Sequence, residues 1–168
     1  MKKLIFILIS AAIFFSGCKK SEEEDKYNPS TDGLIGSWLS KGDNVAELLR
    51  VYFQVDSITA VFHENNTYNV VSYSGGTPTN YNGTFVQTKP TSGTIWTIKL
   101  LQSAPTSVTS EGIFEITGKT PNFLLTYEVV QTEPNIGATP PTPAGGFGSS
   151  NGGALAMMNV QKFVYVPK

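Results

Sequence analysis

The sequence predicts an all-β fold, an up-and-down antiparallel barrel of roughly eight strands with one short helix. From residue 34 onward, runs rich in β-branched and aromatic residues alternate with clusters of Gly, Pro, Asn and Ser, which is typical of sandwiches and barrels. Most links between the runs are short, as a meander of hairpins requires. With 40% apolar and 11% aromatic residues, the 168-residue chain has enough material for one core, which favours a single domain.

Residues 1–17 have the features of a signal peptide. Lysines at positions 2 and 3 form a positive start, and residues 4–15 are apolar except for Ser10. This stretch is too short to span ~30 Å of hydrocarbon comfortably, which favours a signal segment over an uncleaved membrane anchor.

Residues 18–33 are predicted to be a flexible tether. Residues 19–26, KKSEEEDK, form a short charged run that repels itself and has little to bury. A cluster of turn-forming residues at 28–33 ends the segment. The folded domain is therefore expected over residues 34–168.

Eight runs are predicted to be strands, mainly from their alternation of apolar and polar residues. Trp96 and Ile98, for example, alternate with Thr97 and Lys99. Residues 64–66, Glu-Asn-Asn, form a tight turn, so the second and third runs make a hairpin. The predicted strands cover residues 34–40, 57–63, 67–74, 81–88, 94–102, 108–117, 123–131 and 160–166.

Residues 43–54 break the strand pattern and predict a short amphipathic helix, a lid or plug at one end of the sheet. Asp43 or Asn44 is the expected N-cap, and Glu47 and Arg50 are expected to form an ion pair. Five apolar residues recur at the spacing of one helix face. They are Val45, Leu48, Leu49, Tyr52 and Phe53.

Residues 132–158 form a long Gly- and Pro-rich loop. The segments TPPTP and GGFGSSNGG cannot bury enough apolar surface to order themselves independently. A loop of this length is usually either disordered or functional. The composition favours a passive flexible loop, and the alternative is that Phe147 and the apolar run 154–158 dock over the barrel mouth.

The composition excludes several classes of function. A formal net charge of −1 provides no basic surface for nucleic acid, and one Cys with one His cannot supply a zinc site. His63 is therefore expected to be a surface residue, and Glu115 and Glu128 to be solvent-facing strand residues. The sequence has no nucleophile elbow, Walker loop or dinucleotide fingerprint. We expect no enzyme activity, no catalytic residues, no cofactor and no metal.

The residues Phe15-Ser16-Gly17-Cys18 resemble a bacterial lipobox. The resemblance implies that Cys18 is acylated, including with palmitate, and holds the protein on a membrane, because two acyl chains suffice for stable anchoring. The acidic run at 21–25 resembles the export signal of surface lipoproteins in the Bacteroidetes. It implies an outer-membrane lipoprotein of a Gram-negative bacterium that faces the cell surface. Asp56-Ser57-Ile58 resembles the O-glycosylation sequon of that group, which implies a glycan on Ser57.

Gly36-Ser37-Trp38, at the start of the first strand, resembles the opening Gly-x-Trp motif of lipocalins and the wider calycin group. The runs DSITAVF, NTY, YNGTF and IWTI, at 56–62, 66–68, 81–85 and 95–98, also resemble lipocalin-like domains of Bacteroidetes lipoproteins. The resemblance implies that Gly36 permits close backbone approach and that Trp38 plugs the closed end of a barrel. It also implies a basic side chain stacked on Trp38, for which Lys162 is the candidate.

Six residues are predicted to face inward by their alternation along three strands. They serve as packed core or, if a ligand exists, line its cavity; a tyrosine hydroxyl at Tyr68, Tyr81 or Tyr127 would then supply a polar anchor. The leading expectation is a non-catalytic module that binds a small apolar or amphiphilic ligand in an internal void. The alternative is a filled barrel that serves as a structural or protein-interaction module of the envelope, with an unidentified protein partner. The six residues are Trp96, Ile98, Phe114, Ile116, Leu125 and Tyr127.

Overall fold

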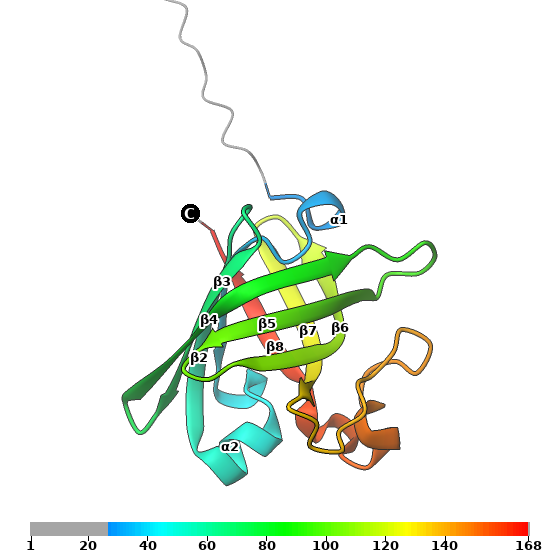
Figure 1. Cartoon of the computed structure of the whole chain (residues 1–168). Helices are drawn as coiled ribbons and strands as arrows, with labels where there is room; N and C mark the ends of the chain where they lie inside the picture. The colour runs from blue at the N-terminus through cyan, green and yellow to red at the C-terminus, as the bar shows by residue number, and fades with distance from the viewer. Residues whose placement is uncertain (1–26, 168) are drawn as a thin grey trace, which may run out of the picture.

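The computed structural model describes residues 27–167 and shows a closed barrel of eight antiparallel strands in sequence order. Each strand pairs with its neighbours along the chain, and the first and last strands pair to close the ring (Figure 1). The predicted fold class is confirmed. The strands are β1 (Gly36–Lys41), β2 (Val55–Phe62), β3 (Thr67–Ser74), β4 (Thr77–Thr88), β5 (Trp96–Ala104), β6 (Val108–Lys119), β7 (Asn122–Glu133) and β8 (Gln161–Val166).

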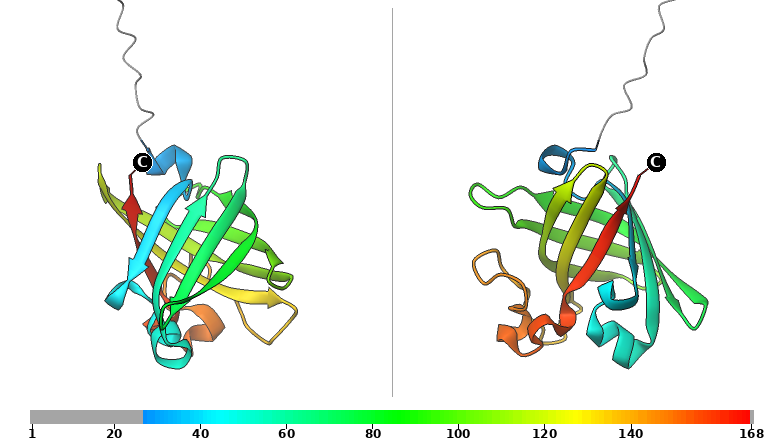
Figure 2. Two further views of the ribbon diagram at one scale, coloured as in Figure 1. Left: turned by 90° about the vertical axis from the view of Figure 1, so that its left-hand side faces the viewer. Right: turned by 180° about the vertical axis from the view of Figure 1, so that it is seen from behind.

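The helical segments are short and gather at the two ends of the barrel (Figures 1 and 2). At the end where β1 begins and β8 finishes, the chain enters through α1. We call this the closed end. The opposite end, the mouth, has α2 before β2 and the long connection between β7 and β8. The helical elements are α1 (Pro29–Asp32), η1 (Gly42–Asn44), α2 (Glu47–Phe53), η2 (Ser150–Gly153) and η3 (Ala156–Asn159).

An aromatic cluster fills the closed end. Trp38 is 1% exposed, and its indole Nε1 donates a hydrogen bond of 2.8 Å to the carbonyl of Leu34. Tyr165 of β8 packs edge-on against Trp38, with ring centroids 5.3 Å apart. Tyr27 stacks on Tyr165 at 4.4 Å, although the sequence placed Tyr27 in the tether. The folded unit therefore includes the described residues from Tyr27 onward.

The partner of Trp38 is Tyr165, and the expectation of Lys162 in that role is wrong. On β8, Gln161 and Phe163 are buried and face inward, so Lys162 between them lies exposed on the outer wall. Tyr165 follows Phe163 on the inward face and lies opposite Trp38 in the register. Alternation along the strand therefore excludes a contact between Lys162 and Trp38.

Helix α2 forms where the apolar spacing predicted it, but its ends differ from the prediction. Its N-cap is Ala46 with no capping side chain, because Gly42–Asn44 forms a separate 3₁₀ turn. The backbone N–H of Ala46 donates instead to the side chain of Gln161, at 2.8 Å. Arg50 pairs with Asp43 at 2.7 Å rather than with Glu47.

The connection between β7 and β8 packs on the outer wall of the barrel and is not a passive loop. It covers Ile113 and Glu128, outward-facing partners on β6 and β7 that are both 0% exposed. The Glu128 carboxylate accepts hydrogen bonds from the backbone N–H groups of Gly148, at 2.6 Å, and Ser150, at 3.1 Å. The expectation that Glu128 faces solvent is therefore wrong, because the loop shields this part of the strand.

Candidate functional site

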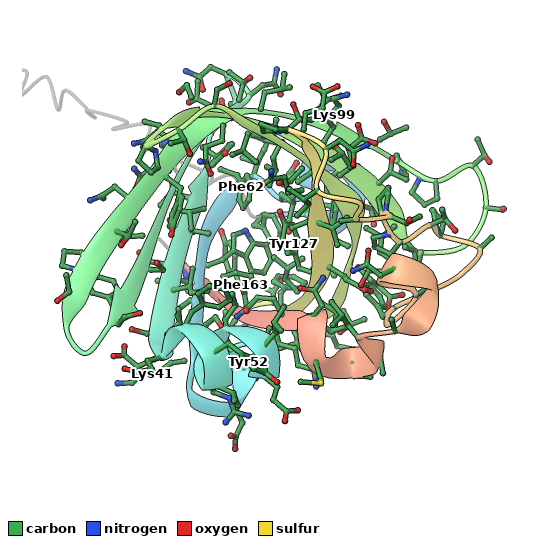
Figure 3. The ribbon with its side chains drawn as sticks, turned by 60° about the horizontal axis from the view of Figure 1, so that its bottom comes forward. Lys41, Tyr52, Phe62, Lys99, Tyr127 and Phe163 are labelled. Atoms are coloured by element: carbon green, nitrogen blue, oxygen red, sulfur yellow. The ribbon has the colours of Figure 1, made fainter. Side chains whose placement is uncertain are left out.

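Burial of the inward side chains varies between the two ends of the barrel. Toward the closed end Phe62, Phe85 and Phe123 are buried, whereas Trp96 and Ile116 are partly exposed. Toward the mouth Ser40, Ile58 and Gln161 are buried, but a larger set of inward side chains is only partly buried. Figure 3 looks from this side onto Tyr127 and Phe163 inside the ring of strands. The partly buried inward residues of the mouth are Val70, Ser72, Tyr81, Leu100, Gln102, Ser110, Val129 and Gln131.

The six residues predicted to face inward all belong to the core or pack against it, on β5, β6 and β7. Three of them are buried, Ile98 at 3%, Phe114 at 0% and Leu125 at 1% exposed. The other three, Trp96, Ile116 and Tyr127, are partly exposed. Trp96 stacks on Phe114 with ring centroids 5.5 Å apart. The set is therefore one continuous patch of lumen wall, with buried and accessible members side by side.

Two inward tyrosines bring hydroxyl groups into an apolar lumen. Tyr68 of β3 packs against Phe62 at 6.1 Å, and Tyr127 of β7 packs against Phe163 at 6.2 Å. Among the described residues, neither hydroxyl has a protein hydrogen-bond partner. Burial raises the pKa of Tyr68 to about 12; burial, with a smaller contribution from Tyr68, also raises the pKa of Tyr127. Both therefore stay neutral at physiological pH, when each is able to donate one hydrogen bond.

The lumen carries no charge in the part of the chain that the structure describes. Most charged strand residues fall on outward positions of the alternation, and Lys99 and Glu111 pair across the outer wall at 2.9 Å. Asp56 and Glu133 lie at register shifts near the ends of their strands, where Asp56 is exposed and Glu133 pairs with the outward Thr109. The polar groups that face inward at the mouth are neutral amides and hydroxyls, such as those of Gln102, Ser110 and Gln131. A charged ligand group would therefore lose its hydration without gaining a counter-charge.

Two inward-facing glutamines hold the ends of the barrel in shape, and neither was predicted from the sequence. At the mouth, the Gln161 side chain accepts from Ala46 and donates to Ser40 and Asn44, which fixes the start of α2. At the closed end, the Gln87 side chain accepts from Leu34 and donates to the carbonyl of Asp32. The sequence pattern could have identified both glutamines, because each is a polar residue at an inward position of a strand.

The rim of the mouth presents apolar side chains to solvent. Val51, Tyr52 and Phe53, at the end of α2, are 60%, 67% and 63% exposed. Tyr52 and Phe53 were expected to be on the buried face, but the core contacts of this segment come from Val45, just before α2, and Leu49 within it. Figure 3 shows Tyr52 on the outer side of α2, beside the opening.

Two hollows lie outside the lumen. The larger, about 470 Å³, is on the outer wall over β3, β4 and β5. The smaller, about 170 Å³, lies between the start of α2 and η3, with Arg50, Met157 and Lys162 among its residues. Neither of these two hollows is the internal void that the sequence predicted.

Other predicted sites remain apart from the mouth. Ser57 is partly exposed near the start of β2, where its hydroxyl donates to Asp56 at 2.9 Å. His63 is exposed at the turn between β2 and β3. Within residues 27–167, no group of three His, Cys, Asp or Glu residues is placed to hold a metal ion. Cys18 and residues 1–17 lie outside the described residues.

None of the helices among the described residues has both the length and the apolar character needed to cross a membrane. Comparisons with protein-family models, with curated proteins and with solved structures gave no match to this chain.

Proposed function

We propose that this protein is a non-catalytic, lipocalin-like binding module that takes a neutral, largely apolar ligand into the mouth of its barrel. The observation that carries this proposal is the band of eight inward-facing residues that stay partly exposed at the mouth. A barrel that served purely as a scaffold would gain stability by filling that end, since burial contributes ~25 cal/mol for each Å² of apolar surface. The partly exposed apolar side chains at the mouth therefore cost stability, and a ligand-binding function explains why they are present.

The chemistry of the mouth limits the ligand class. Val70, Leu100 and Val129 offer aliphatic contacts, and the hydroxyls of Tyr68 and Tyr127 offer hydrogen bonds deeper in the lumen. Most small-molecule sites combine an apolar lining with a few polar groups of this kind. The proposed ligand is therefore an apolar or amphiphilic molecule with an uncharged polar group.

The proposal includes a lipid anchor at Cys18 on the outer membrane, with the domain facing the cell surface. The first described residue, Tyr27, packs at the closed end, and the mouth lies at the opposite end (Figure 2). Eight residues lie between Cys18 and Tyr27, a reach of at most ~32 Å when extended. An anchor at Cys18 therefore keeps the closed end near the bilayer and leaves the mouth open to ligands arriving from solution.

The test is native mass spectrometry of the full chain purified from its own organism, compared with its denatured mass. We expect a mass excess that disappears on denaturation. The variant Leu100→Glu places a charge in the mouth and should abolish this excess. Its matched control, Val86→Glu, places the same charge on an outward side chain that is 57% exposed and should retain it. Absence of a non-covalent excess, together with no uptake of the neutral apolar dye Nile red, would exclude the ligand-binding function.

A second function, a protein-interaction module, is favoured by one observation, the exposed apolar end of α2. Val51, Tyr52 and Phe53 form a patch at the rim that packing within the described chain leaves uncovered. A double variant, Tyr52→Ser with Phe53→Ser, should then lose a cross-linked envelope partner that the Val86→Ser control retains. If both variants recover the same partners, the patch is not an interaction surface.

A further inference from the structure

A hollow lies on the outer wall, on the opposite side of the sheet from the lumen. Its volume is about 470 Å³, within the range of ~300–1,000 Å³ typical of small-molecule sites. It spans β3, β4 and β5, whose order can be followed in Figure 1. The residues that shape its chemistry are His63, Thr67, Asn69, Asn82, Leu101 and Ser103.

A β-bulge produces the hollow. Asn82 of β4 lies opposite Ala104, whereas the next residue, Gly83, lies opposite Gln102, so Ser103 is an extra residue on β5. The Ser103 hydroxyl donates to the carbonyl of Asn82 at 3.1 Å, which fixes the bulge. A Cβ at Gly83 would lie 2.1 Å from the carbonyl oxygen of Leu101, so only glycine allows this approach. Bulges bend strands and redirect side chains, and they are common beside binding sites.

The rim of the hollow is also fixed before any ligand arrives. The side chain of Asn65 accepts from both the backbone N–H, at 3.1 Å, and the hydroxyl, at 2.7 Å, of Thr67. Asn66 adopts a positive φ of 62°, which closes the turn that carries His63. A rigid rim reduces the entropy lost on binding.

A coupled pair of amides lies across the hollow. Asn69 and Asn82 are directly opposite each other in the register, and Asn69 Nδ2 donates to Asn82 Oδ1. This bond leaves Asn69 Oδ1 as an acceptor and Asn82 Nδ2 as a donor, held side by side. Adjacent hydroxyl groups of a polyol match such a pair, because one donates while its neighbour accepts.

The remaining residues define a neutral surface with one apolar face. None of the residues lining the hollow is Lys, Arg, Asp or Glu, and the hydroxyls of Thr67 and Ser103 add two groups that both donate and accept. Leu101 points outward with 43% of its surface exposed, which provides a contact for the C–H face of a sugar ring. The lining therefore supplies no carboxylate, ammonium or guanidinium group to pair with a charged ligand.

We propose that the outer-wall hollow binds a neutral saccharide unit through the Asn69–Asn82 amide pair and Leu101. This site is separate from the mouth, because the alternation of β3 to β5 places the two sets on opposite faces of the same strands. The chain would then carry two independent binding surfaces, one apolar and internal, the other polar and external.

The test is a titration of the full chain, purified in detergent, with maltotriose, cellotriose, xylotriose and mannotriose, followed by the NMR signals of the side-chain amides of Asn69 and Asn82. We expect at least one neutral trisaccharide to give saturable shifts at these two amides. The variant Leu101→Glu should weaken that binding about tenfold or more, because a carboxylate in the hollow must lose hydration, and tenfold corresponds to ~1.4 kcal/mol. The control Val86→Glu, an equally outward charge outside the hollow, should bind normally.

The outcomes separate this site from the mouth. Leu100→Glu, which blocks the mouth, should leave saccharide binding unchanged. The proposal is overturned if none of the four trisaccharides shifts the two amides, or if Leu101→Glu binds as well as the native chain. It is equally overturned if the saccharide response depends on Leu100 and not on Leu101.

Discussion

Position 36 requires glycine, because any side chain there would meet a steric obstacle. Its φ of +131° is essentially restricted to glycine, and a Cβ there would lie 2.8 Å from Cε2 of Tyr165, the ring that packs on Trp38. We expect Gly36→Ala to lower the free energy of unfolding by about 2–4 kcal/mol, measured by urea denaturation. Gly42→Ala is the matched control, because Gly42 also has a positive φ but nothing lies within 4 Å of its Cβ position. Equal losses in the two variants would show that the contact with Tyr165 has no role.

The lumen tyrosines predict how stability depends on alkaline pH. An unfolded tyrosine releases its proton near pH 10.0, whereas burial raises the pKa of folded Tyr68 to about 12. The unfolded state therefore binds fewer protons above pH 10, and stability falls as the pH rises from 10 toward 12. Tyr68→Phe should show a smaller fall over this window than the native chain, whereas Tyr52→Phe, at an exposed tyrosine, should behave like the native chain. Identical profiles for all three proteins would contradict the burial of this hydroxyl.

At the scale of elements, a single carboxylate, that of Glu128, anchors the connection between β7 and β8 to the barrel wall. Glu128→Ala would leave the N–H groups of Gly148 and Ser150 without their acceptor, and hydrogen bonds to charged groups contribute ~1.5–3 kcal/mol each. We expect a loss of about 2–4 kcal/mol and faster amide hydrogen exchange confined to residues 134–160. Glu115→Ala, at a less buried outward glutamate of β6, should change stability by at most ~0.5 kcal/mol. Unchanged exchange in the loop of Glu128→Ala would exclude the anchoring role.

The same elements show what the sequence could and could not predict. Alternation located all eight strands and the inward face, because a side-chain period of two is local information. The burial of Glu128 was not predictable in this way, since it depends on backbone atoms 20 residues away. The cap of α2 was missed for the same reason, because its acceptor, Gln161, lies 115 residues from Ala46. Long-range polar contacts leave no periodic signal in the chain.

At the scale of the whole molecule, the candidate sites were predictable only in part. The six inward residues follow from strand periodicity, but which of them remain accessible depends on how far each end of the barrel is filled. Tyr27, Trp38 and Tyr165 fill the closed end. The outer-wall hollow depends on a one-residue shift in register between β4 and β5, which composition and alternation do not reveal.

The separation of the chain's entry point from the mouth predicts the orientation of the anchored protein. With Cys18 acylated in vesicles, a fluorophore attached at Ser30→Cys, at the closed end, should be quenched strongly by headgroup-labelled nitroxide lipids. The same fluorophore at Tyr52→Cys, on the rim of the mouth, should be quenched much less, because the barrel lies between it and the bilayer (Figures 1 and 3). Both positions are exposed, so labelling should leave the fold intact. Stronger quenching at residue 52 would mean that the apolar rim of α2 rests on the membrane, and the mouth would then receive its ligand from the bilayer and not from solution.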